Sequence, residues 1–195
     1  MSYTCSRCNG EITKGEHDFS NKHHGEPLCR EHQKEAKDLE YRYNMVKGRI
    51  AETLIEELFL SLDYSVFRYG MENTVPGIME LLKGVRGDVA NNIKRMPDFV
   101  IQNPDNKNVF FVEVKFRASE TFTKKDLDDD YPYENCYFII VSKKHIKCIT
   151  YKELMEGKEV TPSSRNYLGN RREFDLDKNM IINFCNFAVK FFENV

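Results

Sequence analysis

The sequence lacks any long run of apolar residues. No stretch reaches the roughly 20 residues that a membrane-spanning helix needs, so we expect no membrane partner. The chain opens with polar residues and cysteines, not with a basic segment followed by an apolar one, so it shows no features of a signal peptide. These two absences predict a cytoplasmic protein in a reducing compartment.

The sequence also lacks an excess of charge of either sign. It holds 29 Lys and Arg against 31 Asp and Glu, a formal net charge of −2, which argues against strong non-specific binding to duplex nucleic acid. Repeats and low-complexity segments are absent too, and 41% apolar residues suit an ordinary globular protein. A chain of 195 residues predicts one full domain, 41–195, with a small N-terminal module, 1–40.

Cysteine and histidine are present at the N-terminus in a metal-binding pattern. Cys5 and Cys8 form one pair, and Cys29 and His32 form a second pair after a spacer of twenty residues. Two-residue gaps let both side chains of a pair reach one ion, so the spacing predicts a structural Zn²⁺ site. Helix-forming residues begin directly after Cys29, and the module resembles a treble-clef zinc finger.

Two alternatives to this ligand set remain open. His23 and His24 are substitute ligands if Cys29 or His32 does not bind, and a disulfide is the competing interpretation of the cysteines. We expect the module to be structural, or to recruit a protein partner.

Residues 31–62 have the pattern of a helix, with a joint near Lys47-Gly48. Its apolar positions share one face, and Glu52 lies at the border of that face. Glu56 lies further round the helix and Glu57 well outside the face. The apolar positions are Ala51, Leu54, Ile55, Leu58 and Leu62.

Residues 96–117 contain the main candidate metal-binding and catalytic residues of the chain. Two apolar runs, at about 97–102 and 109–116, flank a polar turn rich in Asn, Pro and Asp, which predicts a β-hairpin. Asp98 lies at the start of the first strand and Glu113 near the end of the second, so pairing of the strands can bring the two carboxylates together. Glu113 and Lys115 project from one face of their strand. Two carboxylates can hold a hard divalent cation, and a lysine can orient a water.

Pro97-Asp98, the fourteen residues that follow and Glu113-Val114-Lys115 resemble the signature of the PD-(D/E)XK nuclease superfamily. The resemblance implies a restriction-endonuclease-like core over about 47–150, and it implies that Asp98, Glu113 and the Val114 carbonyl bind Mg²⁺ (or Mn²⁺). Lys115 would be the catalytic lysine. The segment Lys47-Gly48-Arg49-Ile50-Ala51-Glu52 resembles the first core helix of many members, so Glu52 is assigned to the metal site, with Glu56 as its substitute.

The remaining segments predict an α/β fold, a mixed sheet flanked by helices. We expect strands at 64–69, 136–141 and 146–150, a capped helix start at Thr123, and a C-terminal helix from about Asp177. Cysteines 136, 148 and 185 lack metal-ligand spacing and are expected in the core. Basic residues in two segments are candidate phosphate contacts: Arg86, Lys94, Arg95, Arg165, Arg171 and Arg172.

The sequence therefore predicts a metal-dependent endonuclease that hydrolyses phosphodiester bonds in DNA, with RNA open as the substrate. Many such enzymes cut duplexes as homodimers, although no residues here identify a dimer face. The alternative is a non-catalytic scaffold that binds nucleic acid or protein, in which the zinc module recruits a partner.

Overall fold

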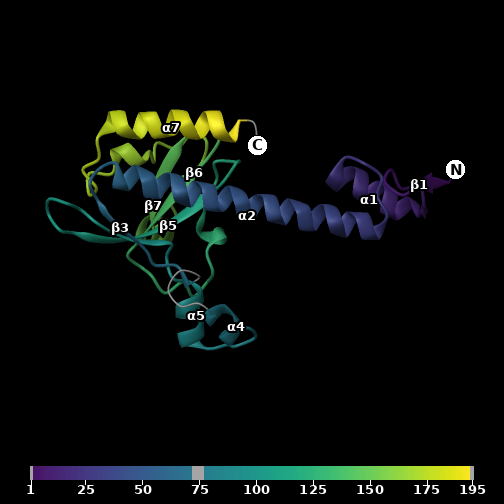
Figure 1. The fold of residues 1–195 in the computed structure, drawn as a ribbon, viewed down its shortest axis with the longest axis horizontal. Helices are drawn as coiled ribbons and strands as arrows, with labels where there is room; N and C mark the ends of the chain where they lie inside the picture. The colour runs from purple at the N-terminus through teal and green to yellow at the C-terminus, as the bar shows by residue number, and fades with distance from the viewer. Residues whose placement is uncertain (1, 72–76, 194–195) are drawn as a thin grey trace. The chain divides into compact units, whose positions relative to one another are not determined.

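The computed structural model describes residues 2–71 and 77–193, drawn as a ribbon in Figure 1. The chain forms two compact units, Met1–Lys47 and Gly48–Val195. Helix α2, Arg30–Leu60, belongs to both units and runs without the break that we predicted near residues 47–48. The predicted domain division at 40/41 falls inside this helix.

The first unit is a short β-hairpin followed by two helices. Strands β1, Tyr3–Thr4, and β2, Glu11–Ile12, pair antiparallel. Helix α1, Lys14–His24, starts with a reciprocal capping box between Thr13 and Glu16 and ends at Gly25, whose φ of 75° is the left-handed conformation that glycine adopts without strain. The buried apolar residues of this unit are few, namely Cys5, Ile12 and Leu28.

The second unit is built on a five-stranded mixed sheet in the order β3-β4-β5-β6-β7. Strands β5 and β6 are parallel, and the other neighbours are antiparallel. This architecture confirms the predicted mixed α/β fold with flanking helices. The strands are β3 Ser65–Arg68, β4 Phe99–Gln102, β5 Val109–Phe116, β6 Cys136–Val141 and β7 Ile146–Thr150.

One face of the sheet is covered by the C-terminal half of α2 and by α7, Lys178–Phe192, which lie side by side (Figure 1). The predicted apolar stripe of α2 is buried there, with Ala51, Leu54, Ile55 and Leu58 in the main core. The side chain of Asp177 caps α7 by accepting from the Met180 N–H at 2.8 Å.

The opposite face packs against α6, Tyr151–Met155, and against the connection between β5 and β6. The capping box predicted at Thr123 and Asp126 forms, but the helix that it begins is one 3₁₀ turn, Lys124–Asp126. Three acids at 128–130 and Pro132 follow, and these residues disfavour a longer helix. The crossover 117–135 is therefore mostly loop.

The described residues between β3 and β4 include two further helices. They are α4, Ile78–Leu81, and α5, Asp88–Lys94. The chain enters this excursion at Tyr69 and Gly70, whose N–H groups donate to the Asp98 carbonyl at 2.8 and 3.2 Å. Asp98 is thus fixed where the excursion ends and β4 begins. A 3₁₀ turn, Leu168–Asn170, precedes α7.

Glu153 ties α6 to the loop before α7. Its carboxylate accepts from the Thr150 N–H at 3.0 Å and from Arg171 at 2.5 Å. Burial alone would raise the Glu153 pKa, but the Arg171 guanidinium and the Thr150 hydrogen bonds lower it.

We expect Glu153→Gln to lower the free energy of unfolding at pH 7 by about 1.5–3 kcal/mol, the range for hydrogen bonds to charged groups. The folded pKa lies below the unfolded value of about 4.3, so the wild-type advantage is present above that pH and is lost as pH falls through the folded pKa. Urea unfolding of wild type and Glu153→Gln at several pH values measures this difference in the free energy of unfolding.

Glu156→Gln is the control, because it breaks only the exposed ion pair with Lys158. It should change the free energy of unfolding by at most about 0.5 kcal/mol. Equal losses for both variants would contradict a stabilising role for the Glu153 carboxylate.

Candidate functional site

The first unit gathers the four predicted zinc ligands. One ligand atom from each of Cys5, Cys8, Cys29 and His32 lies within 4.8 Å of the others, so this group could hold a zinc ion. His32 Nδ1 is 3.3 Å from Cys5 Sγ and 3.1 Å from Cys29 Sγ. Three sulfurs and one imidazole are the donor set of tetrahedral zinc sites.

Local backbone structure brings the two pairs together. After Cys5 the chain turns back through Asn9, which has a φ of 57°, and the Cys5 N–H donates to the Gly10 carbonyl at 2.8 Å. Cys29 immediately precedes α2 and His32 lies in its first turn, as predicted. Burial raises the Cys5 pKa, but N–H groups from Cys29, Cys8 and Arg7 lower it to about 6, which favours the thiolate that binds metal.

The alternatives for this module are not supported by the geometry. All six cysteines are free thiols, so the disulfide interpretation is wrong for this structure. His23 and His24 lie at the end of α1 and do not belong to the four-residue group.

The second unit brings Asp98, Glu113 and Lys115 onto one face of the sheet. Phe99 pairs with Val112 across β4 and β5, so Asp98 lies opposite Glu113, as the hairpin predicted. Glu113 and Lys115 alternate with Val112 and Val114, which enter the core on the other face. The Glu113 side chain is 12% exposed and that of Lys115 is 35% exposed, so solvent reaches the group.

Hydrogen bonds join these residues across the two strands. The Asp98 N–H donates to Glu113 Oε2 at 3.2 Å, and the Val114 N–H donates to Asp98 Oδ2 at 2.7 Å. Lys115 Nζ forms an ion pair with Glu113 Oε1. The resemblance implied that the Val114 carbonyl binds the metal. The structure places the Val114 N–H against Asp98, and the role of the carbonyl stays a prediction.

The site carries more negative than positive charge. Burial and the neighbouring Glu113 carboxylate raise the Asp98 pKa well above its usual range, against the opposing effects of Lys115 and the Val114 N–H. Burial lowers the Lys115 pKa, but Glu113 and Asp98 outweigh it and raise the value, so the ammonium stays charged. A buried acid whose ionised form is disfavoured by a neighbouring carboxylate, as Asp98 is, lies in a suitable environment for a cation.

Glu52 lies within electrostatic range of this pair. Its charge contributes to the raised pKa of Asp98 and to that of Arg68 at the end of β3. The substitute, Glu56, accepts a hydrogen bond from Arg68 Nε at 3.0 Å and forms an ion pair with the same guanidinium. Its carboxylate is therefore paired with Arg68 and is less suited to bind the metal. Across the described residues, Asp98, Glu113 and Glu52 do not form a group with ligand atoms within 4.8 Å; only the Cys/His group does.

Several candidate phosphate contacts have structural partners. Arg95 pairs with Asp128 at 2.9 Å and Asp130 at 2.6 Å, which fastens α5 to the crossover 117–135. Arg171 holds Glu153, as described above. Lys94 Nζ likewise donates to the Val85 carbonyl at 2.7 Å, so these three basic residues have partners within the fold. Arg86, Arg165 and Arg172 stay predictions as phosphate contacts.

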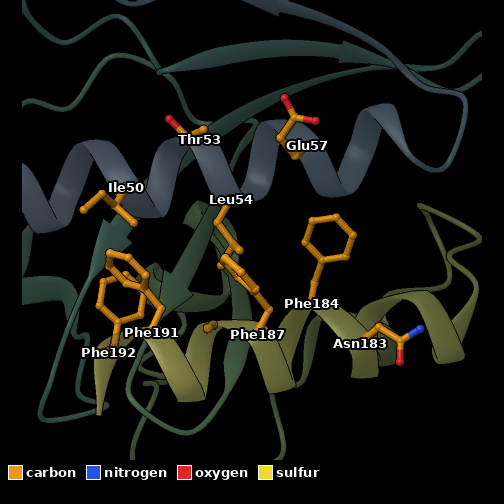
Figure 2. A pocket seen from close by; sticks show the side chains of 10 residues that line it. Ile50, Thr53, Leu54, Glu57, Asn183, Phe184, Phe187, Phe191 and Phe192 are labelled. Carbon is orange, nitrogen blue, oxygen red and sulfur yellow. The ribbon is translucent and has the colours of Figure 1, made fainter. Parts of the chain in front are cut away.

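A separate apolar groove of about 560 Å³ lies between α2 and α7, where Phe184, Phe187, Phe191 and Phe192 face Ile50 and Leu54 (Figure 2). Glu57, which we predicted to lie well outside the apolar face of α2, is exposed and also lines the groove. The groove contains none of the predicted site residues.

Tyr131 is a residue near the carboxylates that the sequence did not single out. It lies in the crossover 117–135, and the charges of Glu113 and Asp98 both raise its pKa, after the larger effect of burial. Its sequence context of acids and Pro132 gave no periodic signal that could have identified it.

No protein-family model, curated protein or solved structure matches the chain. In the part of the chain that the structure describes, no helix is both long and apolar enough to cross a membrane.

Proposed function

We propose that the chain is a metal-dependent endonuclease of the PD-(D/E)XK type that hydrolyses DNA, with a restriction-endonuclease-like core. The observation that carries the proposal is the convergence of Asp98, Glu113 and Lys115 on one sheet face, joined by hydrogen bonds across β4 and β5. The position of Glu52 near Asp98 supports it further.

The donor set suits a hard cation. Asp98, Glu113, the Val114 carbonyl and Glu52 would hold Mg²⁺ or Mn²⁺ through oxygen, and the ion would supply Lewis-acid activation of a phosphate and its attacking water. Lys115 keeps its charge beside Glu113, so it would orient that water and balance charge developing on the phosphate. The Cys/His group would hold a structural zinc ion.

A second candidate is a non-catalytic scaffold that binds nucleic acid or a protein through the zinc module. It is favoured by the internal hydrogen bonds of the acids, since Glu113 is already engaged by the Asp98 N–H and by Lys115. One experiment separates the two candidates.

Zinc-loaded protein is incubated with single-stranded, duplex and branched DNA and with RNA, with Mg²⁺ or Mn²⁺ added or omitted. We expect cleavage that requires the added cation and falls by at least about 10²-fold in Glu113→Ala, which loses one proposed metal ligand. Omitting Mg²⁺ is a cleaner control than EDTA, because a chelator also removes zinc from the Cys/His group. Binding without cleavage by both proteins would favour the scaffold.

A further inference from the structure

The ring of Tyr131 lies over the sheet face that carries the carboxylates. Its centroid is 5.4 Å from that of Phe138, and it stacks on Tyr151 at 6.1 Å with an interplanar angle of 25°. Phe138 is the parallel-ladder partner of Glu113, so the two side chains project from the same face. Tyr131 is therefore fixed by aromatic contacts beside Glu113.

The Tyr131 hydroxyl is buried and has no hydrogen-bond partner among the described residues. The Cys136 thiol is near enough to interact with this hydroxyl, but sulfur is a weak acceptor. The thiol directs its own S–H toward the Tyr137 carbonyl, with the sulfur 3.7 Å from that oxygen. Burying a hydroxyl without a partner is unfavourable. Burial, Cys136 and Glu113 raise the Tyr131 pKa, so the hydroxyl keeps its proton and can donate it in a hydrogen bond.

The carboxylates beside it are engaged by donors that a cation would disturb. Glu113 Oε1 accepts from Lys115, Glu113 Oε2 accepts from the Asp98 N–H, and Asp98 Oδ2 accepts from the Val114 N–H. A cation that takes these oxygens must turn the carboxylates or displace some donors. Carboxylates that bind a metal usually also accept hydrogen bonds from residues that do not touch the metal. Asp98 and Glu113 with a bound cation would therefore need a nearby hydrogen-bond donor.

We propose that Tyr131 is a positioning residue, whose hydroxyl donates a hydrogen bond to a carboxylate of the Asp98–Glu113 pair when that pair holds a divalent cation. This inference rests on the proposed function, because Tyr131 would support the carboxylates that bind the metal in that same site. It explains why a tyrosine, rather than a phenylalanine, stands in an aromatic cluster that offers its hydroxyl only the weakly accepting sulfur of Cys136.

The test compares Mn²⁺ affinity and thermal stability of zinc-loaded wild type and Tyr131→Phe. We expect the variant to bind Mn²⁺ about 10- to 100-fold more weakly, the usual effect of losing an outer-layer partner. Without Mn²⁺ its melting temperature should be equal or higher, because an unpartnered buried hydroxyl is removed. Tyr133→Phe is the matched control: its hydroxyl donates to the Asn92 carbonyl at 3.1 Å, so its loss should reduce stability and leave Mn²⁺ affinity within about twofold.

The outcomes are distinguishable from those of the proposed function. If wild type binds Mn²⁺ and Asp98→Ala does not, the proposed metal site stands, and equal Mn²⁺ affinity of wild type and Tyr131→Phe would then overturn the role of Tyr131 alone. A wild type that binds Mn²⁺ no better than Asp98→Ala overturns both. Reduced stability of metal-free Tyr131→Phe with unchanged affinity would show a purely structural tyrosine.

Discussion

Removing zinc from the Cys/His group is expected to unfold the first unit, residues 1–47. This unit buries only a few apolar side chains, and domains this small usually need a metal or disulfides to fold. Structural zinc sites of this size contribute about 10–16 kcal/mol of apparent binding free energy at pH 7, so no other single change should have a larger effect.

The experiment is Cys29→Ala, with metal content, amide hydrogen exchange and limited proteolysis as measurements. We expect the bound zinc to fall from one ion per chain to a small fraction, with rapid exchange and cleavage confined to residues 1–47. Cys185→Ala is the matched control, since that half-buried thiol lies on α7 in the other unit and should leave one zinc ion bound. A folded, protease-resistant first unit without zinc would refute a structural role for the metal.

In the proposed nuclease, Lys115→Met is expected to reduce DNA cleavage by about 10²- to 10³-fold and to leave binding of the divalent cation intact. Lys115 supplies the positive charge beside Glu113, and removing a preorganised charge from a site of this type has that effect on the chemical step. Mn²⁺ affinity should stay equal or increase, because the variant loses a cation that competes for the same carboxylate.

Lys152→Met is the control for this variant. Lys152 is exposed on α6, beside β5 residues 109–111 and thus at the opposite end of the strand from Lys115. Its loss should change neither cleavage nor Mn²⁺ affinity. If Lys115→Met lost cleavage and Mn²⁺ together, Lys115 would be a structural support of the carboxylates and not the residue that orients water.

The same site predicts the sign of a pH effect on metal binding. The Asp98 pKa is raised, so lowering the pH through that value protonates a proposed ligand and weakens Mn²⁺ binding, while raising the pH strengthens it. In the metal-free protein the folded state holds this proton more tightly than the unfolded state, so Asp98 destabilises the fold increasingly as pH rises from about 4 toward the raised pKa. Added Mn²⁺ should offset that loss.

Much of the second unit could be predicted because its strands are short apolar runs between turn residues. The β4–β5 hairpin is an example: Asn103 Oδ1 accepts from the N–H groups of Asp105 and Asn106, a local turn that its sequence specifies. Cys136 and Cys148 are fully buried, as expected for cysteines without ligand spacing. Alternation along β5 was enough to place Glu113 and Lys115 on one face.

The parts that escaped prediction depend on contacts distant in sequence. The crossover 117–135 has no periodicity. Its position depends on packing against the sheet and on Arg95, the residue after α5, which pairs with Asp128 and Asp130. Arg68 on β3 pairs with Glu56 on α2, twelve residues earlier in the chain, and this pairing distinguishes Glu56 from Glu52 as a candidate metal ligand. Sequence spacing within one element cannot show either contact.

The parallel pairing of β5 with β6, the one such pairing among the described strands, has a consequence for the order of folding. The β4–β5 hairpin closes a short loop, so the contacts between Asp98 and Glu113 can form early. Strand β6 joins β5 only after the irregular crossover 117–135 has closed a longer loop, and such non-local pairing is slow. We therefore expect the acidic pair to be assembled before Tyr131 reaches it, so that a late folding step completes the surroundings of the site.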